Sequence, residues 1–412
     1  MNVPDLAPPS SEADSLPAAP PFPFPRTRPL DPPELYGQAR RRQPVFEVTL
    51  WDGRRAWLVT RHDDVRRILV DPRFSGEFGN PDFPAVTAAR RVVDQQERAF
   101  VGMDNPKHDF FRRMFTREFS TRRMAAMRPR VEAIASGLVD DLVASGPPAD
   151  LVASIGVRFP SMVMCDLIGS PYEDHRFIMT CAAARHGLTQ SPEEAGRKAR
   201  ELANYFRRLI DAREAAPADD LVSRIIAEQV VPGHLARDEF AEIGAMILRA
   251  GHDTTANMIG IGTLLFLLHP EQMTAVRDDP AVVAGAVEEL LRFASPVQFS
   301  PRRVALEDVE FGDVTIRKGE GVFALNPSAN RDERVFDEPD RFDIRRDASD
   351  HMAFGYGIHQ CLGQMLARTE LQVIFPLLFQ RVPTLRLAAP VSAIRFKHEM
   401  QIYGLHNLPV TW

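Results

Sequence analysis

The chain has 412 residues, of which 44% are hydrophobic and 26% charged, with three cysteines and a formal net charge of −6. A chain of this length can bury a substantial core, whereas its acidity argues against non-specific nucleic-acid binding and its few cysteines argue against a disulfide-bonded scaffold. No stretch approaches the roughly 20 apolar residues of a membrane span, and the N-terminus lacks a signal-peptide pattern, so we expect a cytoplasmic protein without a membrane anchor.

The first 33 residues are rich in proline and include the run Pro20-Pro21-Phe22-Pro23-Phe24-Pro25. Proline has no backbone N–H and fixes φ, so residues 1–33 cannot form a regular helix and are expected to be extended, or disordered at their start. No comparable composition change follows. Residues 34–412 are therefore predicted to form a single domain.

A hairpin is predicted next, with strands at residues 45–50 and 56–60 around Asp52-Gly53, a favoured hairpin turn. Helical periodicity dominates from about residue 63 onward. Further strand signals lie near residues 304–323, 384–386 and 400–412. The predicted fold class is mainly α with small β-sheets (α+β).

The longest helical signal covers residues 238–268, roughly 45 Å at 1.5 Å per residue. In its middle, Gly251 and the neighbours Thr254 and Thr255 weaken the helix, because glycine costs about 1 kcal/mol against alanine and threonine hydroxyls compete for carbonyls one turn back. We expect a local distortion there. If the threonines had no function, Thr254 would simply hydrogen-bond to the carbonyl of Ala250.

An acid and a base, Glu289 and Arg292, lie three residues apart on one face of a predicted helix over residues 282–293. Such pairs are usually solvated and stabilise a helix by a few tenths of a kcal/mol. The apolar character of this helix favours burial of the pair instead.

The most informative segment is residues 354–363, in which Cys361 lies between a glycine-rich turn and an apolar helical stretch. Its glycines let the backbone turn tightly and approach a flat ligand. A helix beginning at residues 362–363 would lower the pKa of the Cys361 thiol from about 8.5, because a helix N-terminus favours negative charge. A lone cysteine beside glycines is usually a buried small hydrophobe. Five positions of this segment match those of a known metal-binding loop, and this match favours a metal-binding thiolate.

This spacing, F-G-x-G-x-H-x-C-x-G, resembles the haem-ligand loop of the cytochrome P-450 family. The resemblance covers about residues 34–412 and implies that family's fold, with a long central helix over haem b and a thiolate loop before a C-terminal helix. It makes Cys361 the axial ligand of the haem iron. The other residues that it places against the haem are Ala250, Gly251, Phe354, Gly355 and Gly363.

The same resemblance assigns partners to the two haem propionates. His108 and Arg112, one helical turn apart, match the family's H-x-x-x-R. Arg303 and His359 match two further positions. Arginine suits this role because its planar fork pairs bidentately with a carboxylate.

Glu289 and Arg292 match the family's E-x-x-R, a pair with a structural role around the haem and none in the chemical step. In the family an arginine from a later segment completes the pair. Either Arg341 or Arg345 could supply that charge here.

The hexapeptide at residues 250–255 resembles the family's central-helix motif, [AG]-G-x-[DE]-T-[TS]. On that likeness Thr254 orients dioxygen and Asp253 takes part in proton delivery, since the reaction needs protons in a site otherwise kept dry. The implied enzyme is a monooxygenase that inserts one atom of O2 into a hydrophobic small molecule, by hydroxylation or epoxidation, in secondary metabolism or catabolism. Two alternatives are a nitric-oxide-reductase-like member of the fold, which would lack the acid, and a haem-binding sensor or carrier, which needs no proton relay.

The sequence has no dinucleotide fingerprint and no iron–sulfur motif, so electrons from NAD(P)H must arrive through a partner. Likeness to soluble bacterial members implies a ferredoxin with its ferredoxin reductase, and a monomeric enzyme. The ferredoxin would dock over a basic run that comprises Arg112, Arg113, Arg117, Arg122, Arg123, Arg128 and Arg130.

The substrate is expected to be a hydrophobic compound such as a terpenoid, macrolide, steroid or aromatic. Its pocket is expected to form from residues 76–103 and 172–204. By family position, the candidate pocket residues are Met246, Ala250, Val297, Phe299 and Ile402.

Overall fold

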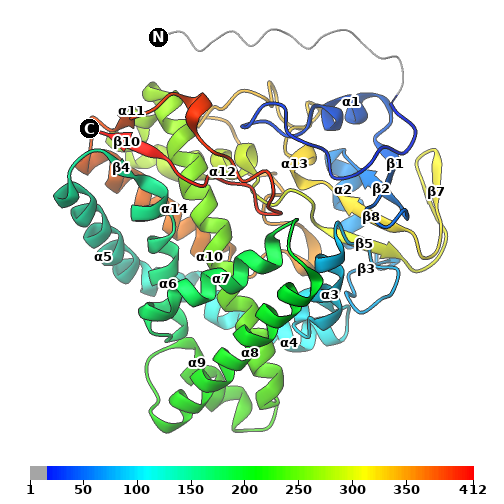
Figure 1. Ribbon diagram of the computed structural model, residues 1–412, viewed down its shortest axis with the longest axis horizontal. Coiled ribbons are helices and arrows are strands. Elements are labelled where there is room, and N and C mark those ends of the chain that lie inside the picture. The colour runs from blue at the N-terminus through cyan, green and yellow to red at the C-terminus, as the bar shows by residue number, and fades with distance from the viewer. Residues whose placement is uncertain (1–15) are drawn as a thin grey trace.

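The computed structural model describes residues 16–412, and most of them lie in helices packed around one long central helix (Figure 1). The α-helices are α1 (Glu34–Arg42), α2 (His62–Val70), α3 (Ala88–Gln96), α4 (Lys107–Thr116), α5 (Thr121–Ser145), α6 (Arg158–Ile168), α7 (His175–His186), α8 (Pro192–Ala215), α9 (Leu221–Ile225), α10 (Arg237–Leu268), α11 (Pro270–Asp278), α12 (Val283–Ala294), α13 (Asn326–Ala329) and α14 (Gln364–Arg381). The strands are β1 (Val45–Thr49), β2 (Arg55–Val59), β3 (Phe74–Ser75), β4 (Ala149–Asp150), β5 (Arg302–Ala305), β6 (Val309–Phe311), β7 (Val314–Ile316), β8 (Gly321–Ala324), β9 (Arg386–Leu387) and β10 (Pro409–Thr411).

The largest sheet has five strands in the order β1-β2-β8-β5-β3 and lies at one side of the helices (Figure 1). The predicted hairpin forms its edge, because β1 and β2 pair antiparallel and Gly53 takes the left-handed conformation that the turn requires, with φ +80°. The other sheets have three strands (β4-β10-β9) and two strands (β6-β7). The prediction of a mainly α fold with small sheets is confirmed.

Helix α10 is the long central helix that the sequence predicted, and it begins one residue earlier than expected. It is buried on nearly all sides, as expected for a helix that is apolar all round, and it packs against α6, α7, α8 and α14. Its N-terminus is capped by the Glu239 carboxylate, which accepts a hydrogen bond from the backbone N–H of Ala236 at 3.0 Å. Within residues 16–412, no helix combines the length and apolar character needed to cross a bilayer.

Residues 16–33 of the proline-rich segment form no regular helix, as predicted, and they pack against the rest of the chain. Phe22 donates its backbone N–H to the carbonyl of Thr49 at 3.0 Å, and Thr49 donates back to Pro20 at 2.9 Å. The ring of Phe22 is 5% exposed and lies in an aromatic cluster with Phe299 and Phe323. Residues 1–15, where disorder was expected, lie outside the described residues.

Candidate active site

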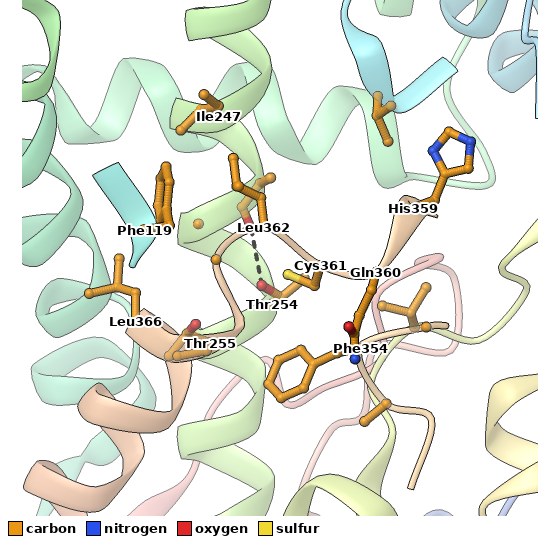
Figure 2. Close-up of a pocket in the computed structure, with 18 of the residues that line it drawn as sticks. Phe119, Ile247, Thr254, Thr255, Phe354, His359, Gln360, Cys361, Leu362 and Leu366 are labelled. Atoms are coloured by element: carbon orange, nitrogen blue, oxygen red, sulfur yellow. Dashed lines mark hydrogen bonds between the residues drawn. The ribbon is translucent and has the colours of Figure 1, made fainter. Parts of the chain in front are cut away.

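A largely apolar cavity of about 340 Å³ lies between α10 and the loop that precedes α14 (Figure 2). The side chains from the loop include Cys361 and those from α10 include Thr254, so the two motifs of the sequence meet in one site. Residues that line this cavity are Phe100, Val101, Arg112, Phe119, Met164, Met246, Ile247, Ala250, Gly251, Thr254, Thr255, Met258, Pro296, Val297, Phe354, Gly355, His359, Cys361, Gly363, Leu366 and Glu370.

The loop at residues 354–363 is held closed by its own backbone. The N–H of Cys361 donates to the carbonyl of Phe354 at 2.8 Å. Gly357 has φ +73°, and a Cβ atom there would lie 2.8 Å from the carbonyl oxygen of Leu69, so no other residue fits without a backbone shift. This closed turn leaves Cys361 exposed to the interior cavity.

The predicted effect of a helix N-terminus on Cys361 is wrong. Burial raises the pKa of the Cys361 thiol, and this effect outweighs the backbone N–H of Gly363 and the charges of Arg112 and Arg368, which act in the opposite direction. The physical reason is that α14 begins only at Gln364, so the thiol lies in the turn before the helix. Coordination to a metal ion would deprotonate such a thiol without help from the helix.

On the opposite wall, α10 presents Thr254 to the cavity. The hydroxyl of Thr254 donates to the carbonyl of Ala250 at 3.0 Å, as the purely structural alternative expected (Figure 2). The local distortion expected here from the sequence does not interrupt the helix, because α10 is a continuous α-helix from Arg237 to Leu268.

Asp253 lies beside Thr254 but is buried behind the cavity wall. Its Oδ1 accepts a hydrogen bond from Asn257 Nδ2 at 3.0 Å, while its Oδ2 has no partner. Burial raises the pKa of Asp253, and the nearby charge of Lys397 partly opposes this. A carboxyl group of this kind can hold a proton close to Thr254.

Cationic and unsatisfied polar groups gather around His359, which lines the cavity two residues before Cys361. The ring centroids of His108 and His359 are 4.4 Å apart, and the Nε2 atom of each is buried without a partner. Arg112 donates to the carbonyl of Gln360 at 2.6 Å, and Arg303 is buried. Burial lowers the pKa of the Arg303 guanidinium to about 10, and the charge of Asp104 opposes this only in part, so a further anion would stabilise the buried cation.

This donor set fits haem. A thiol faces the cavity, and four basic side chains converge where two propionates would need partners. Gly76 allows the approach, because a Cβ atom there would lie 3.0 Å from His359 Nε2 and 3.6 Å from Arg303 Nη1.

The five candidate substrate residues divide into two groups. Met246, Ala250 and Val297 line the cavity, whereas Phe299 and Ile402 do not. The ring of Phe299 packs 5.5 Å from that of Phe22, and Ile402, which pairs with Val297 in a β-bridge, is buried without reaching the cavity lining.

The two predicted pocket stretches also differ. Residues 76–103 contribute Phe100 and Val101, but residues 172–204 contribute no side chain to the lining found in the described part of the chain. Their helices α7 and α8 pack against α10 from outside instead.

Several lining residues escaped the sequence analysis. Ile247 and Met258 share the helical face of Thr254 on α10, so their spacings of seven and four residues from that threonine could have found them. Glu370 could not be found in this way. It is 1% exposed, neither of its oxygens has a partner, and burial raises its pKa well above the ordinary range.

The pair Glu289 and Arg292 is completely buried at the end of α12. Arg292 donates to Glu289 at 2.6 Å and to the carbonyl of Asn330 at 2.7 Å. The third charge comes from Arg346, whose Nε lies 3.4 Å from Glu289 Oε1.

Both candidates for that third charge are therefore wrong. The side chain of Arg341 is 62% exposed and pairs with Glu338, and Arg345 contributes only a backbone N–H, to Asp343. The backbone turn after Phe342 points the third arginine of this segment inward.

Comparison with known proteins gives one consistent result. The family model described as Cytochrome P-450 matches residues 193–383. The chain is 43% identical over 395 residues to Cytochrome P-450 105A3 from Streptomyces carbophilus, with 96% of each chain covered. It is 44% identical over 393 residues to Pentalenic acid synthase from Streptomyces avermitilis, with 95% of this chain and 97% of the relative covered.

Comparison with solved structures gives the same family. The mycinamicin VIII methyl hydroxylase MycCI from Micromonospora griseorubida, bound to mycinamicin VIII, superposes with a TM-score of 0.90 at 37% identity. The superposition covers 95% of this chain and 100% of that one. The similarity thus extends over nearly the whole chain, including the cavity.

Proposed function

The chain belongs to the cytochrome P-450 family and is a haem-thiolate monooxygenase, and we propose that Cys361 is the thiolate ligand of its haem iron. One observation supports this assignment above all. Cys165 and Cys181 are buried, whereas Cys361 is exposed to the cavity that Thr254 also lines. The haem b, when bound, activates O2 with electrons from NAD(P)H delivered by a redox partner, so that one oxygen atom enters a hydrophobic substrate.

We propose that His108, Arg112, Arg303 and His359 hold the haem propionates. Their support is the pair of unpartnered ring nitrogens and the buried guanidinium of Arg303, all of which need acceptors or an anion. Phe354, Gly355 and Gly363, with Ala250 and Gly251 on α10, line the cavity where the flat macrocycle would pack.

Thr254 and Asp253 serve proton delivery in this proposal. While the Thr254 hydroxyl donates a hydrogen bond to the carbonyl of Ala250, its oxygen can still accept a hydrogen bond from a proton donor. Asp253 supplies the proton, since its raised pKa and its free Oδ2 let it cycle between protonated and ionised forms. A nitric-oxide reductase or a sensor would have no use for this acid, and no observation favours either alternative.

The substrate is a hydrophobic small molecule of secondary metabolism. We propose a terpenoid or macrolide within that class, because the cavity walls are formed mainly by side chains such as Phe100, Met164, Met246 and Val297. The names of two relatives, a pentalenic acid synthase and a mycinamicin hydroxylase, are consistent with this choice. Screening such compounds for a shift of the haem absorbance band would identify the substrate.

We propose that the electron donor is a ferredoxin, reduced by its own reductase. Arg113 is exposed on α4, the helix of Arg112, and Arg117 is exposed directly after that helix, while Arg112 itself lines the cavity near Cys361. The enzyme is a monomer in this proposal, with residues 34–412 as its single catalytic domain. We assign it to the cytoplasm, in agreement with three unpaired cysteines.

Replacement of Thr254 by alanine tests the proton-delivery roles. Thr254→Ala should bind substrate and accept electrons but divert oxygen to hydrogen peroxide. Asp253→Asn should slow turnover by about 10²-fold or more, with little peroxide, since it removes the acid and keeps the shape. A fully coupled Thr254→Ala enzyme would contradict the role of Thr254, and NADH-driven consumption of nitric oxide without ferredoxin would favour the reductase alternative.

A further inference from the structure

One wall of the cavity is built from two segments that hold each other by backbone hydrogen bonds. Pro296 and Val297 line the cavity, and the segment 400–403 pairs alongside them, with Ile402 opposite Val297 in a β-bridge. Tyr403 donates its N–H to the carbonyl of Pro296 at 2.8 Å, and Gln298 donates to the carbonyl of Gln401 at 3.1 Å. Neither segment belongs to a named strand, so this wall has little sheet structure of its own.

The back of this wall is fastened by the side chain of Gln298. Val297 lines the cavity, and the next side chain along an extended segment faces the opposite way. Gln298 is 5% exposed and uses both ends of its amide. Its Nε2 donates to the carbonyl of Met400 at 2.8 Å, and its Oε1 accepts from Arg26 Nε at 2.9 Å.

Arg26 comes from the proline-rich N-terminal segment and contacts both halves of the wall. Besides the bond to Gln298, its guanidinium lies 4.0 Å from the centre of the Tyr403 ring and donates to the carbonyl of Asp31 at 3.1 Å. Only 9% of Arg26 is exposed, and burial lowers its pKa to about 10. A charge that is costly to bury is thus held by an amide, a ring and a carbonyl.

A second contact fixes the same segment to the wall. The ring of Phe22 packs 5.5 Å from that of Phe299, which follows Gln298, and 4.9 Å from that of Phe323 in β8. The N-terminal segment therefore contacts two consecutive wall residues from behind, one through a hydrogen bond and one through an aromatic pair.

We propose that residues 20–31, the N-terminal brace, set the shape of the substrate-side wall, with Arg26 as the positioning residue that fixes the segments 296–298 and 400–403. The brace determines which ligand sizes and shapes the cavity binds well, without touching the ligand. This inference rests on the proposed function in one respect, namely that the substrate occupies the cavity beside Val297.

Ligand size provides the test. Wild-type holoenzyme and Arg26→Met would be titrated with imidazole and with a bulky triarylmethyl-imidazole, and binding followed by haem absorbance. Imidazole is too small to reach the wall, so its affinity should not change. The bulky ligand should lose about tenfold in affinity, or about 1.4 kcal/mol, because it contacts a wall that is no longer held in one position. Arg28→Met is the matched control, because Arg28 is 47% exposed and pairs only with nearby Asp31 among its described ion pairs.

The ratio of the two affinities separates a positioning role from simple destabilisation. A changed ratio in Arg26→Met, an unchanged one in Arg28→Met, and partial recovery in Arg26→Lys support the brace. An unchanged ratio overturns it, whatever the melting temperature. If Arg26→Met does not fold, Gln298→Met breaks the same bond from the other side. Wild-type protein that lacks the haem-thiolate spectrum would instead refute the proposed function.

Discussion

The thiolate loop and the substrate-side wall face the same cavity but are built in opposite ways. The loop consists of ten consecutive residues and is closed by backbone hydrogen bonds from Cys361 to Phe354 and from Gln360 to Gly357. The wall includes a hydrogen bond between Arg26 and Gln298, which are 272 positions apart. Under our proposals, the iron ligand is therefore encoded locally, whereas the shape of the substrate-side wall depends on the packing of distant segments.

The sharpest test of this difference compares one residue from each region. Cys361→Ala should abolish the red-shifted absorbance of the reduced, carbon-monoxide-bound enzyme and all monooxygenase activity, because no other cysteine reaches the cavity. Val297→Ala should keep both and alter only ligand affinity, by about 1 kcal/mol. A Cys361→Ala protein that kept the absorbance band would refute the ligand assignment.

The next largest effect is expected for the buried pair of Glu289 and Arg292. Glu289→Ala leaves Arg292 buried without its carboxylate, which costs about 3–5 kcal/mol. We expect low yield and poor haem incorporation, measured as the haem-to-protein absorbance ratio. Glu338→Ala, which removes the partner of exposed Arg341, is the control and should behave as wild type.

Glu370, on α14 just after the loop, should make stability depend on pH. Burial raises its pKa well above the ordinary range, so the folded protein keeps a proton that the unfolded chain releases above about pH 4.5. Stability is then lost as pH rises towards the folded-state pKa, by up to about 1.4 kcal/mol per pH unit. Glu370→Gln removes this loss.

Thermal unfolding of wild type and Glu370→Gln at pH 5.5 and at pH 7.5 measures the effect. The melting temperature of Glu370→Gln should exceed that of wild type by more at pH 7.5 than at pH 5.5. The same difference in melting temperature between the two proteins at both pH values would mean that Glu370 is ionised in the folded enzyme.

The smallest effect concerns the surface beside the thiolate loop. Charge reversal at Arg113 and Arg117 should slow reduction by ferredoxin a few-fold, on the order of 1 kcal/mol, and weaken its dependence on salt. Peroxide-driven turnover should stay near normal. Equal loss in both assays would indicate damage to the cavity rather than to docking.

Features whose residues lie close together in sequence were predicted well. The hairpin at residues 45–60, the central helix to within one residue, and the cysteine loop all follow from local turn chemistry and periodicity. The fold class and the meeting of Cys361 with Thr254 followed from the resemblance that these motifs support.

Features that depend on distant packing were not predicted. Val297 lines the cavity, whereas Phe299 packs against Phe22 from the distant N-terminal segment. Arg346 rather than Arg341 or Arg345 reaches Glu289 because of a backbone turn without a clear pattern. The pKa of Cys361 depends on burial, which outweighs the helix effect that a sequence can indicate.

The packing of Phe22 and Arg26 also bears on how the protein is made. Both leave the ribosome early, but their partners Phe323, Gln298 and Tyr403 are synthesised near the end of translation. The ring of Phe22 therefore lacks these late partners until most of the chain has been synthesised. Proline-rich sequence resists strand pairing, which keeps this exposed segment from associating with other nascent chains.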